Sequence, residues 1–192
     1  MKKSIIAAGA ASVALAAMPI VGAFAAVPSV TDNITATVGA GCTITNEQAT
    51  NTVTIPSVAL NAVSNYVSSN GISVTCNAQN WTISAVGDGA ENHKTDLYNS
   101  AANASIPTGT TLDGTASNWA FKLGITTTEA EAATITSGYG SDATIPDTAT
   151  VVATGTKASS ATLTPSYKVS VGSSQAGGDY TGAVKYTVSA SV

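Results

Sequence analysis

Residues 180–192 constrain the fold most, because apolar and polar side chains alternate along them with a period of two. One face of this stretch carries its larger apolar and aromatic residues, which are Tyr180, Val184, Tyr186 and Val188. The other face carries mainly threonine, lysine and serine. Such alternation predicts a β-strand with one buried and one solvated face. Because unpaired N–H and C=O groups promote aggregation, we expect this strand either to pair on both sides or to form a protected edge.

Shorter alternating stretches recur along the chain, with turn residues between them. They occupy residues 33–38, 42–44, 52–56, 72–76 and 81–86, and three more begin at Trp119, Thr148 and Ser166. Residues 126–136 contain two glutamates and several alanines, so they could instead form one or two turns of helix. About seven to nine short strands without long helices predict an antiparallel β-sandwich or barrel.

The N-terminal segment has the pattern of a signal peptide. A basic start of two lysines precedes an apolar run at residues 5–17, and AFA at 23–25 matches the small-x-small pattern that signal peptidase recognises. We expect residues 1–25 to be a cleaved signal peptide and residues 26–192 to form a single domain. An uncleaved membrane anchor is the alternative, because the apolar run is almost long enough to span a bilayer.

The chain contains two cysteines, Cys42 and Cys76. In an exported protein two cysteines indicate one disulfide rather than a metal site or a catalytic thiol. Cys42 alternates in phase with Ile44, and Cys76 with Val74, so we expect both to point inward. A loop of this length would stabilise the fold by roughly 3–4 kcal/mol. A pair of free thiols is the alternative.

The charge balance excludes several classes of partner. The formal net charge is −4, and loss of the two N-terminal lysines takes it to about −6. The chain has no arginine, and its few lysines do not cluster. Nucleic-acid binding requires clustered cations, so we expect none, and attraction to anionic lipid is disfavoured for the same reason. No apolar run after the N-terminal one is long enough to span a membrane, so we expect no membrane insertion after signal cleavage.

Candidate chemistry is confined to one polar loop. Its titratable residues are Asp88, Glu91, His93 and Asp96. They could bind a metal ion, but their spacing matches no calcium loop, and a solvated hairpin tip is the alternative. The sequence contains no G-x-S-x-G elbow, phosphate loop or dinucleotide fingerprint, so we expect neither catalysis nor a cofactor. A secreted hydrolase remains the least favoured class.

Two tryptophans, Trp81 and Trp119, have two interpretations. Exposed tryptophans stack on sugar rings, whereas buried ones fill the space between sheets. Trp81 alternates in phase with Ile83, which favours the core, and Trp119 begins a predicted strand. The long polar segment at residues 87–118 is the first place to expect a binding surface, because long loops are often functional.

Three stretches resemble pilin-like β-sandwich subunits of the spore-coat-U and chaperone–usher group. They are NITATVGAGCTI at 33–44, ISVTCNAQNWTISAVGDG at 72–89 and GGDYTGAVKYTVSA at 177–190. The resemblance implies a pilin-like or immunoglobulin-like sandwich with one disulfide, in which an N-terminal strand completes the sheet of the next subunit. The donor residues it implies are Val30, Ile34, Ala36 and Val38, and residues 180–190 would line the groove. Pilins usually lack one strand, whereas this chain has enough predicted strands to complete itself.

A second resemblance is to WxL-type bacterial surface domains. It is carried by WTI at 81–83, NWAFKL at 118–123 and SSQAGGDYTGAVKYTVSA at 173–190, with isoleucine where the first motif has leucine. That family implies non-covalent attachment to cell-wall polymer. Together the resemblances predict a secreted bacterial cell-surface structural or adhesive protein, fimbria-like in form, whose partners are other subunits or further copies of itself. A module that binds cell-wall polymer or a host glycan is the alternative.

Overall fold

The computed structural model describes residues 40–46, 52–127, 133–156 and 159–191, all within one compact unit, Val38–Val192. These residues form strands and no helix. The predicted signal peptide and the predicted donor residues Val30, Ile34, Ala36 and Val38 lie outside the described residues. Both cysteines lie within them. No helix long and apolar enough to cross a membrane occurs in these four ranges.

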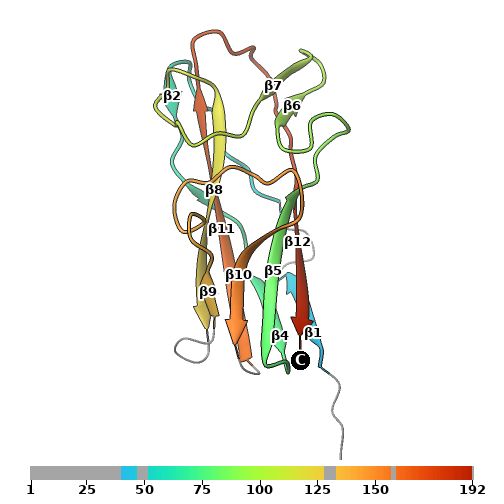
Figure 1. The fold of residues 1–192 in the computed structure, drawn as a ribbon. Coiled ribbons are helices and arrows are strands. Elements are labelled where there is room, and N and C mark those ends of the chain that lie inside the picture. The colour runs from blue at the N-terminus through green and yellow to red at the C-terminus, as the bar shows by residue number, and fades with distance from the viewer. Residues whose placement is uncertain (1–39, 47–51, 128–132, 157–158, 192) are drawn as a thin grey trace, which may run out of the picture. The chain divides into compact units, whose positions relative to one another are not determined.

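Two antiparallel sheets make up the sandwich (Figure 1). The first sheet contains β1 (Cys42–Asn46), β2 (Ala62–Val63), β3 (Val67–Ser68), β4 (Ile72–Cys76), β8 (Asn118–Thr127) and β11 (Ser159–Val171). The second contains β5 (Asn80–Gly87), β9 (Ala133–Ile135), β10 (Thr150–Thr156) and β12 (Val184–Ser191). A separate hairpin joins β6 (Leu97–Asn99) to β7 (Ala104–Ile106). The predicted all-β antiparallel sandwich is therefore confirmed.

Strand β11 organises the first sheet. It pairs along one side with β8 and along the other with β4, β3 and β2 in turn, and β1 then pairs with the far side of β4. The second sheet has the order β12-β5-β10-β9. Within the described ranges, β1 and β12 are thus each paired on one side only. The closing strand is an edge strand and not a central one.

The core lies between the sheets, where every second residue of a strand points inward. On β5 the buried residues include Trp81, Ile83 and Ala85, and on β8 they include Trp119 and Phe121. The exposed fractions of Trp81 and Trp119 are 1% and 3%, so both side chains belong to the core. The Trp119 indole N–H donates a hydrogen bond to the Thr95 carbonyl oxygen at 2.8 Å.

Two strand predictions need correction, and one alternative is tested only at its ends. Residues 52–56 pair with no neighbouring strand in the described part of the chain, although Ile55 packs against the core. The closing strand begins at Val184, because Thr181 instead forms an isolated bridge with Tyr98. The flanks of the segment considered for a helix lie in β8 and β9, while residues 128–132 lie outside the described residues.

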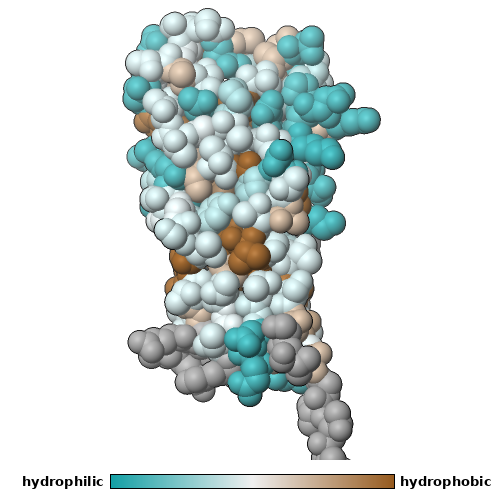
Figure 2. Space-filling model, in the orientation of Figure 1, coloured by the Kyte–Doolittle hydropathy of each residue, from teal (hydrophilic) through white to brown (hydrophobic). Residues whose placement is uncertain are grey.

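The surface is weakly polar over most of the face in Figure 2, which agrees with the low content of charged residues, 9% of the chain. The most hydrophilic residues gather in the region where Figure 1 places β6 and β7. Two large hydrophobic residues of the described part are well exposed, Leu60 at 55% and Val151 at 38%. Single exposed residues of this kind are normal for a soluble surface.

Candidate functional site

The edge formed by β1 and β12 is the candidate functional site. The two strands belong to different sheets and contact each other without forming a ladder. Their inward side chains pack against the core but stay partly exposed, and these are Cys42 and Ile44 on β1 and Val184, Tyr186 and Val188 on β12. Two neighbouring sheet edges with core side chains between them are suited to accept another extended segment.

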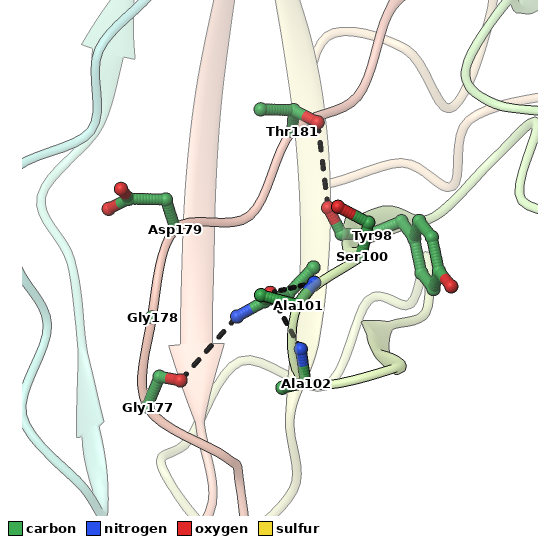
Figure 3. A pocket seen from close by; sticks show the side chains of 9 residues that line it. Tyr98, Ser100, Ala101, Ala102, Gly177, Gly178, Asp179 and Thr181 are labelled. Atoms are coloured by element: carbon green, nitrogen blue, oxygen red, sulfur yellow. Dashed lines mark hydrogen bonds between the residues drawn. The ribbon is translucent and has the colours of Figure 1, made fainter.

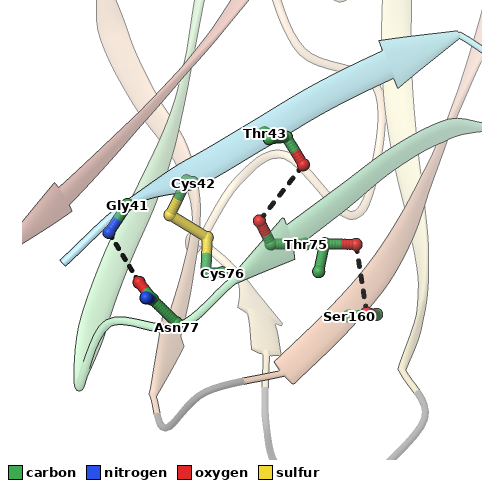
Figure 4. Close-up of a disulfide and its surroundings, with 7 residues drawn as sticks. All are labelled: Gly41, Cys42, Thr43, Thr75, Cys76, Asn77 and Ser160. Carbon is green, nitrogen blue, oxygen red and sulfur yellow. Dashed lines mark hydrogen bonds between the residues drawn. A yellow bond between two sulfur atoms is a disulfide. The ribbon is translucent and has the colours of Figure 1, made fainter. Parts of the chain in front are cut away.

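A disulfide fixes β1 at this edge (Figure 4). Cys42 and Cys76 are directly paired across β1 and β4, with 4.2 Å between their Cα atoms. The predicted pairing of the two cysteines is confirmed, and the alternative of free thiols is wrong. Beside the disulfide, the Gly41 amide donates a hydrogen bond to the Asn77 side-chain oxygen at 2.6 Å, and the Asn77 amide donates to the Gly41 carbonyl at 3.1 Å. These contacts hold the start of β1 in place.

A pair of tyrosines links the two sheets beneath the β12 edge. The hydroxyl oxygens of Tyr167 on β11 and Tyr186 on β12 lie 3.2 Å apart, within hydrogen-bond distance. Tyr186 pairs across the sheet with Ala85, and Tyr167 stacks on Trp119 with 6.1 Å between ring centroids. Burial raises the pKa of Tyr167, and it raises that of Tyr186 well above the ordinary value of 10.0.

The tyrosine pair predicts a loss of stability at high pH. Both pKa values are higher in the folded state than in the unfolded chain, so above about pH 10 the unfolded chain releases these protons first. The stability that the protonated tyrosines contribute is therefore complete below pH 10.0 and is lost as the pH rises above it. We expect Tyr186→Phe to make the free energy of unfolding fall less steeply above about pH 10. At neutral pH the same change should cost about 1 kcal/mol, the value of one hydrogen bond. Urea unfolding across this pH range measures both effects.

The burial of this pair is tested by how steeply the free energy of unfolding falls above about pH 10, and not by its value at neutral pH. An unchanged slope in Tyr186→Phe would mean that the hydroxyl titrates freely. The neutral-pH measurement serves as the internal control, since only the lost hydrogen bond contributes there. Tyr167→Phe should reduce the slope in the same direction, because its pKa is raised by the same cause.

The polar loop considered for metal binding does not assemble a site. His93 Nδ1 lies 3.5 Å from the Asp96 carboxylate, and the His93 ring stacks on Tyr98 with 4.0 Å between centroids. In the part of the chain that the structure describes, no three His, Cys, Asp or Glu side chains come together as a metal site would require. Asp88 and Glu91 therefore do not join His93 and Asp96 in such a group. The arrangement fits a solvated loop.

A second cluster lies around Tyr66, which the sequence did not single out. The Tyr66 hydroxyl donates a hydrogen bond to the Asp142 carboxylate, and Lys122 Nζ and Lys168 Nζ lie 3.7 Å and 5.1 Å from its ring centroid. Burial, together with the bond to Asp142, raises the pKa of Tyr66 to about 12. The ring and hydroxyl are thus both occupied by residues of the same domain. The cluster links the loops that contain Tyr66 and Asp142 to strands β8 and β11 of the first sheet.

No protein-family model matches the chain, and no curated protein matches it in sequence. The fold is similar to that in the crystal structure of the P pilus rod subunit PapA, with a TM-score of 0.41 and 14% sequence identity. The similarity covers 77% of this chain and 97% of that chain. It describes the fold alone, so a function has to be argued from the residues of this chain.

Proposed function

We propose that this protein is an exported, non-enzymatic subunit of a cell-surface fibre. One observation carries the proposal: β1 and β12 present neighbouring sheet edges that are each paired on one side in the described residues. Partly exposed core side chains line both edges. An extended segment from another copy would pair with the free edge of β12 alongside β1 and bury these side chains.

Residues 30–38 are suited to supply that segment. Ile34, Ala36 and Val38 alternate with Thr35 and Thr37, so a strand here would present one apolar and one polar face. The apolar face would contact Val184, Tyr186 and Val188, while backbone N–H and C=O groups would form the ladder. Assembly of this kind needs no cofactor and no catalytic group.

The disulfide and the two tryptophans bear on export and on the wall-binding alternative. A structural disulfide persists in oxidising compartments outside the cytoplasm, which supports secretion to the cell surface. Attachment to a wall glycan through stacked tryptophans receives no support, because Trp81 and Trp119 are both buried. The WxL-like alternative would therefore need other contact residues.

The test compares the two faces of the donor segment. Ile34→Asp places a charge on the apolar face, where it would be buried unpaired on assembly, so we expect association to weaken by about 3 kcal/mol, or roughly a hundredfold. Thr35→Asp is the matched control on the opposite face and should assemble like the parent chain. Size-exclusion chromatography and negative-stain microscopy of the exported protein measure the outcome, with fibres expected for the parent.

Two results would contradict assembly by strand addition. The first is a parent protein that stays monomeric at every concentration, in particular one that sediments with isolated cell walls instead. The second is an Ile34→Asp variant that forms fibres as readily as Thr35→Asp. Circular dichroism of both variants checks that their folds are intact before assembly is compared.

A further inference from the structure

A hollow of about 620 Å³ opens between the end of strand β6 and the loop that precedes β12. Residues 98–102 form one wall, and residues 177–179 with Thr181 form the other (Figure 3). Its volume lies within the range of about 300–1,000 Å³ that small-molecule sites occupy. The hollow involves neither β1 nor the face of β12 discussed above, so it is independent of the proposed assembly.

Both walls are fixed by the fold. The Tyr98 amide donates to the Thr181 carbonyl at 2.8 Å and the Thr181 amide donates to the Tyr98 carbonyl at 3.0 Å, which joins the two segments at one end. The Asn99 side chain is buried, and its oxygen accepts hydrogen bonds from the amides of Ala101 and Ala102 at 3.0 and 3.1 Å. A site held in this way loses little conformational entropy when a ligand binds.

The walls leave hydrogen-bonding groups free. Within the described residues, the backbone amides of Ser100, Gly178 and Asp179 donate to no protein acceptor, and the Ser100 hydroxyl has no partner. Most lining side chains are small, so these backbone groups are accessible to a ligand. A ligand that offers several hydroxyl oxygens at short spacing would match them, directly or through water.

The lining selects against other ligand classes. In the described part of the chain, the one large side chain of the lining is that of Tyr98, so these walls lack the continuous apolar surface that binds a hydrophobic molecule. Among the described lining residues, Asp179 alone carries a charged side chain, which Figure 3 shows directed away from residues 98–102. The described lining residues include no lysine, and an acidic neighbour disfavours an anion.

From these groups we propose that the hollow binds a neutral saccharide unit. The backbone amides and the Ser100 hydroxyl bond its ring hydroxyls. The affinity of one such unit is roughly millimolar, as expected for a small ligand in a shallow, solvated site. Repetition of the subunit along a surface would raise the overall strength of attachment without new contacts.

Gly177 lines the hollow and can take a side chain without strain in the backbone. A Cβ atom at Gly177 would meet no atom within 4 Å, and its φ lies outside the left-handed region. Gly177→Phe therefore adds a bulky side chain at a residue that lines the hollow. Gly140 has the same open surroundings and an ordinary φ but does not line the hollow, so Gly140→Phe is the matched control.

The experiment uses protein that carries Ile34→Asp in every sample, because this change is expected to prevent fibre formation. It titrates this protein with methyl mannopyranoside, methyl galactopyranoside and N-acetylglucosamine, with glucuronic acid as the anionic comparison. Amide chemical shifts from ¹⁵N-labelled protein report the binding. We expect at least one neutral probe to cause saturable shifts confined to residues 98–102 and 177–181. Gly177→Phe should weaken this binding at least about tenfold, Ser100→Ala by a few-fold, and Gly140→Phe not at all.

The proposal is overturned by any of three results. No neutral probe shifts these amides up to its solubility limit, Gly177→Phe binds as tightly as the parent protein, or glucuronic acid binds more tightly than every neutral probe. None of these results bears on fibre formation, which is measured separately. A folded spectrum for both phenylalanine variants establishes that a loss of binding is local.

Discussion

Replacing Cys42 and Cys76 with alanine is expected to lower the free energy of unfolding by about 4 kcal/mol. The disulfide joins residues that are 34 positions apart, and closing a loop of that size restricts the unfolded chain. Typical domains are stable by only about 5–15 kcal/mol, so the loss is a large share of the total. Of the changes considered, this one should have the largest effect on stability.

The structure adds a local consequence to this loss. Strand β1 pairs with β4 alone in the described residues, so the disulfide and five paired residues hold it to the sheet. Without the covalent link, an edge strand of this length should open more often than β4 or β11, which lie inside the sheet. Hydrogen exchange of the β1 amides should therefore accelerate more than that of β11.

Urea unfolding of the parent protein, with and without reductant, measures the global effect. The reduced parent and the double alanine variant should unfold at similar urea concentrations, both well below the oxidised parent. Agreement between these two samples is the control for damage from the substitutions themselves. A reduced parent as stable as the oxidised one would contradict the expectation, and it would show that the disulfide contributes little to the stability of the domain.

The parts of the fold that were predictable are those where a local pattern and a buried face coincide. ISVTC at β4 and WTISAV within β5 alternate strictly, and their inward residues form the core. The disulfide was predictable because both cysteines lie in phase with inward residues of their strands. In each case one face of the strand had to be buried, so the sequence pattern determined its orientation.

Other elements depend on contacts that no local pattern records. The hairpin of β6 and β7 has strands of only three residues, too short for alternation to be visible. Conversely, residues 52–56 alternate well but pair with no sheet edge among the described residues. Strand assignment requires a partner, and the partner is chosen by the tertiary structure.

The candidate site was partly predictable for the same reason. The inward face of β12 was predicted correctly from its alternation, with Val184, Tyr186 and Val188 in phase. Its position at an edge was not fixed by the sequence, because pairing on both sides and a protected edge were both consistent with the pattern. The contact of Tyr186 with Tyr167 joins two sheets and leaves no signal in either strand alone.

Gly155→Ala is the second large effect that we expect, a loss of about 3 kcal/mol in the free energy of unfolding. Gly155 on β10 pairs directly with Trp81 on β5, and the indole ring lies over the glycine. A Cβ atom added at Gly155 would overlap the six-membered part of that ring. Because Trp81 is only 1% exposed, the ring has no free space into which to move.

Gly140→Ala is the matched control, since a Cβ atom there meets nothing within 4 Å. It should change stability by no more than about 0.5–1 kcal/mol. Urea unfolding followed by circular dichroism compares the two variants with the parent. If Gly155→Ala unfolded at the same urea concentration as Gly140→Ala, the register between β10 and β5 would be wrong.

A double-mutant cycle separates the steric clash from a general weakness of β10. Trp81→Leu alone should cost about 3 kcal/mol, because it leaves a cavity in the core. In the Gly155→Ala background the same change should cost less, since the smaller side chain leaves room for the added methyl group. We expect a favourable coupling of about 1–2 kcal/mol. Strictly additive losses would mean that residues 81 and 155 do not contact each other, and the pairing of β5 with β10 would then need another register.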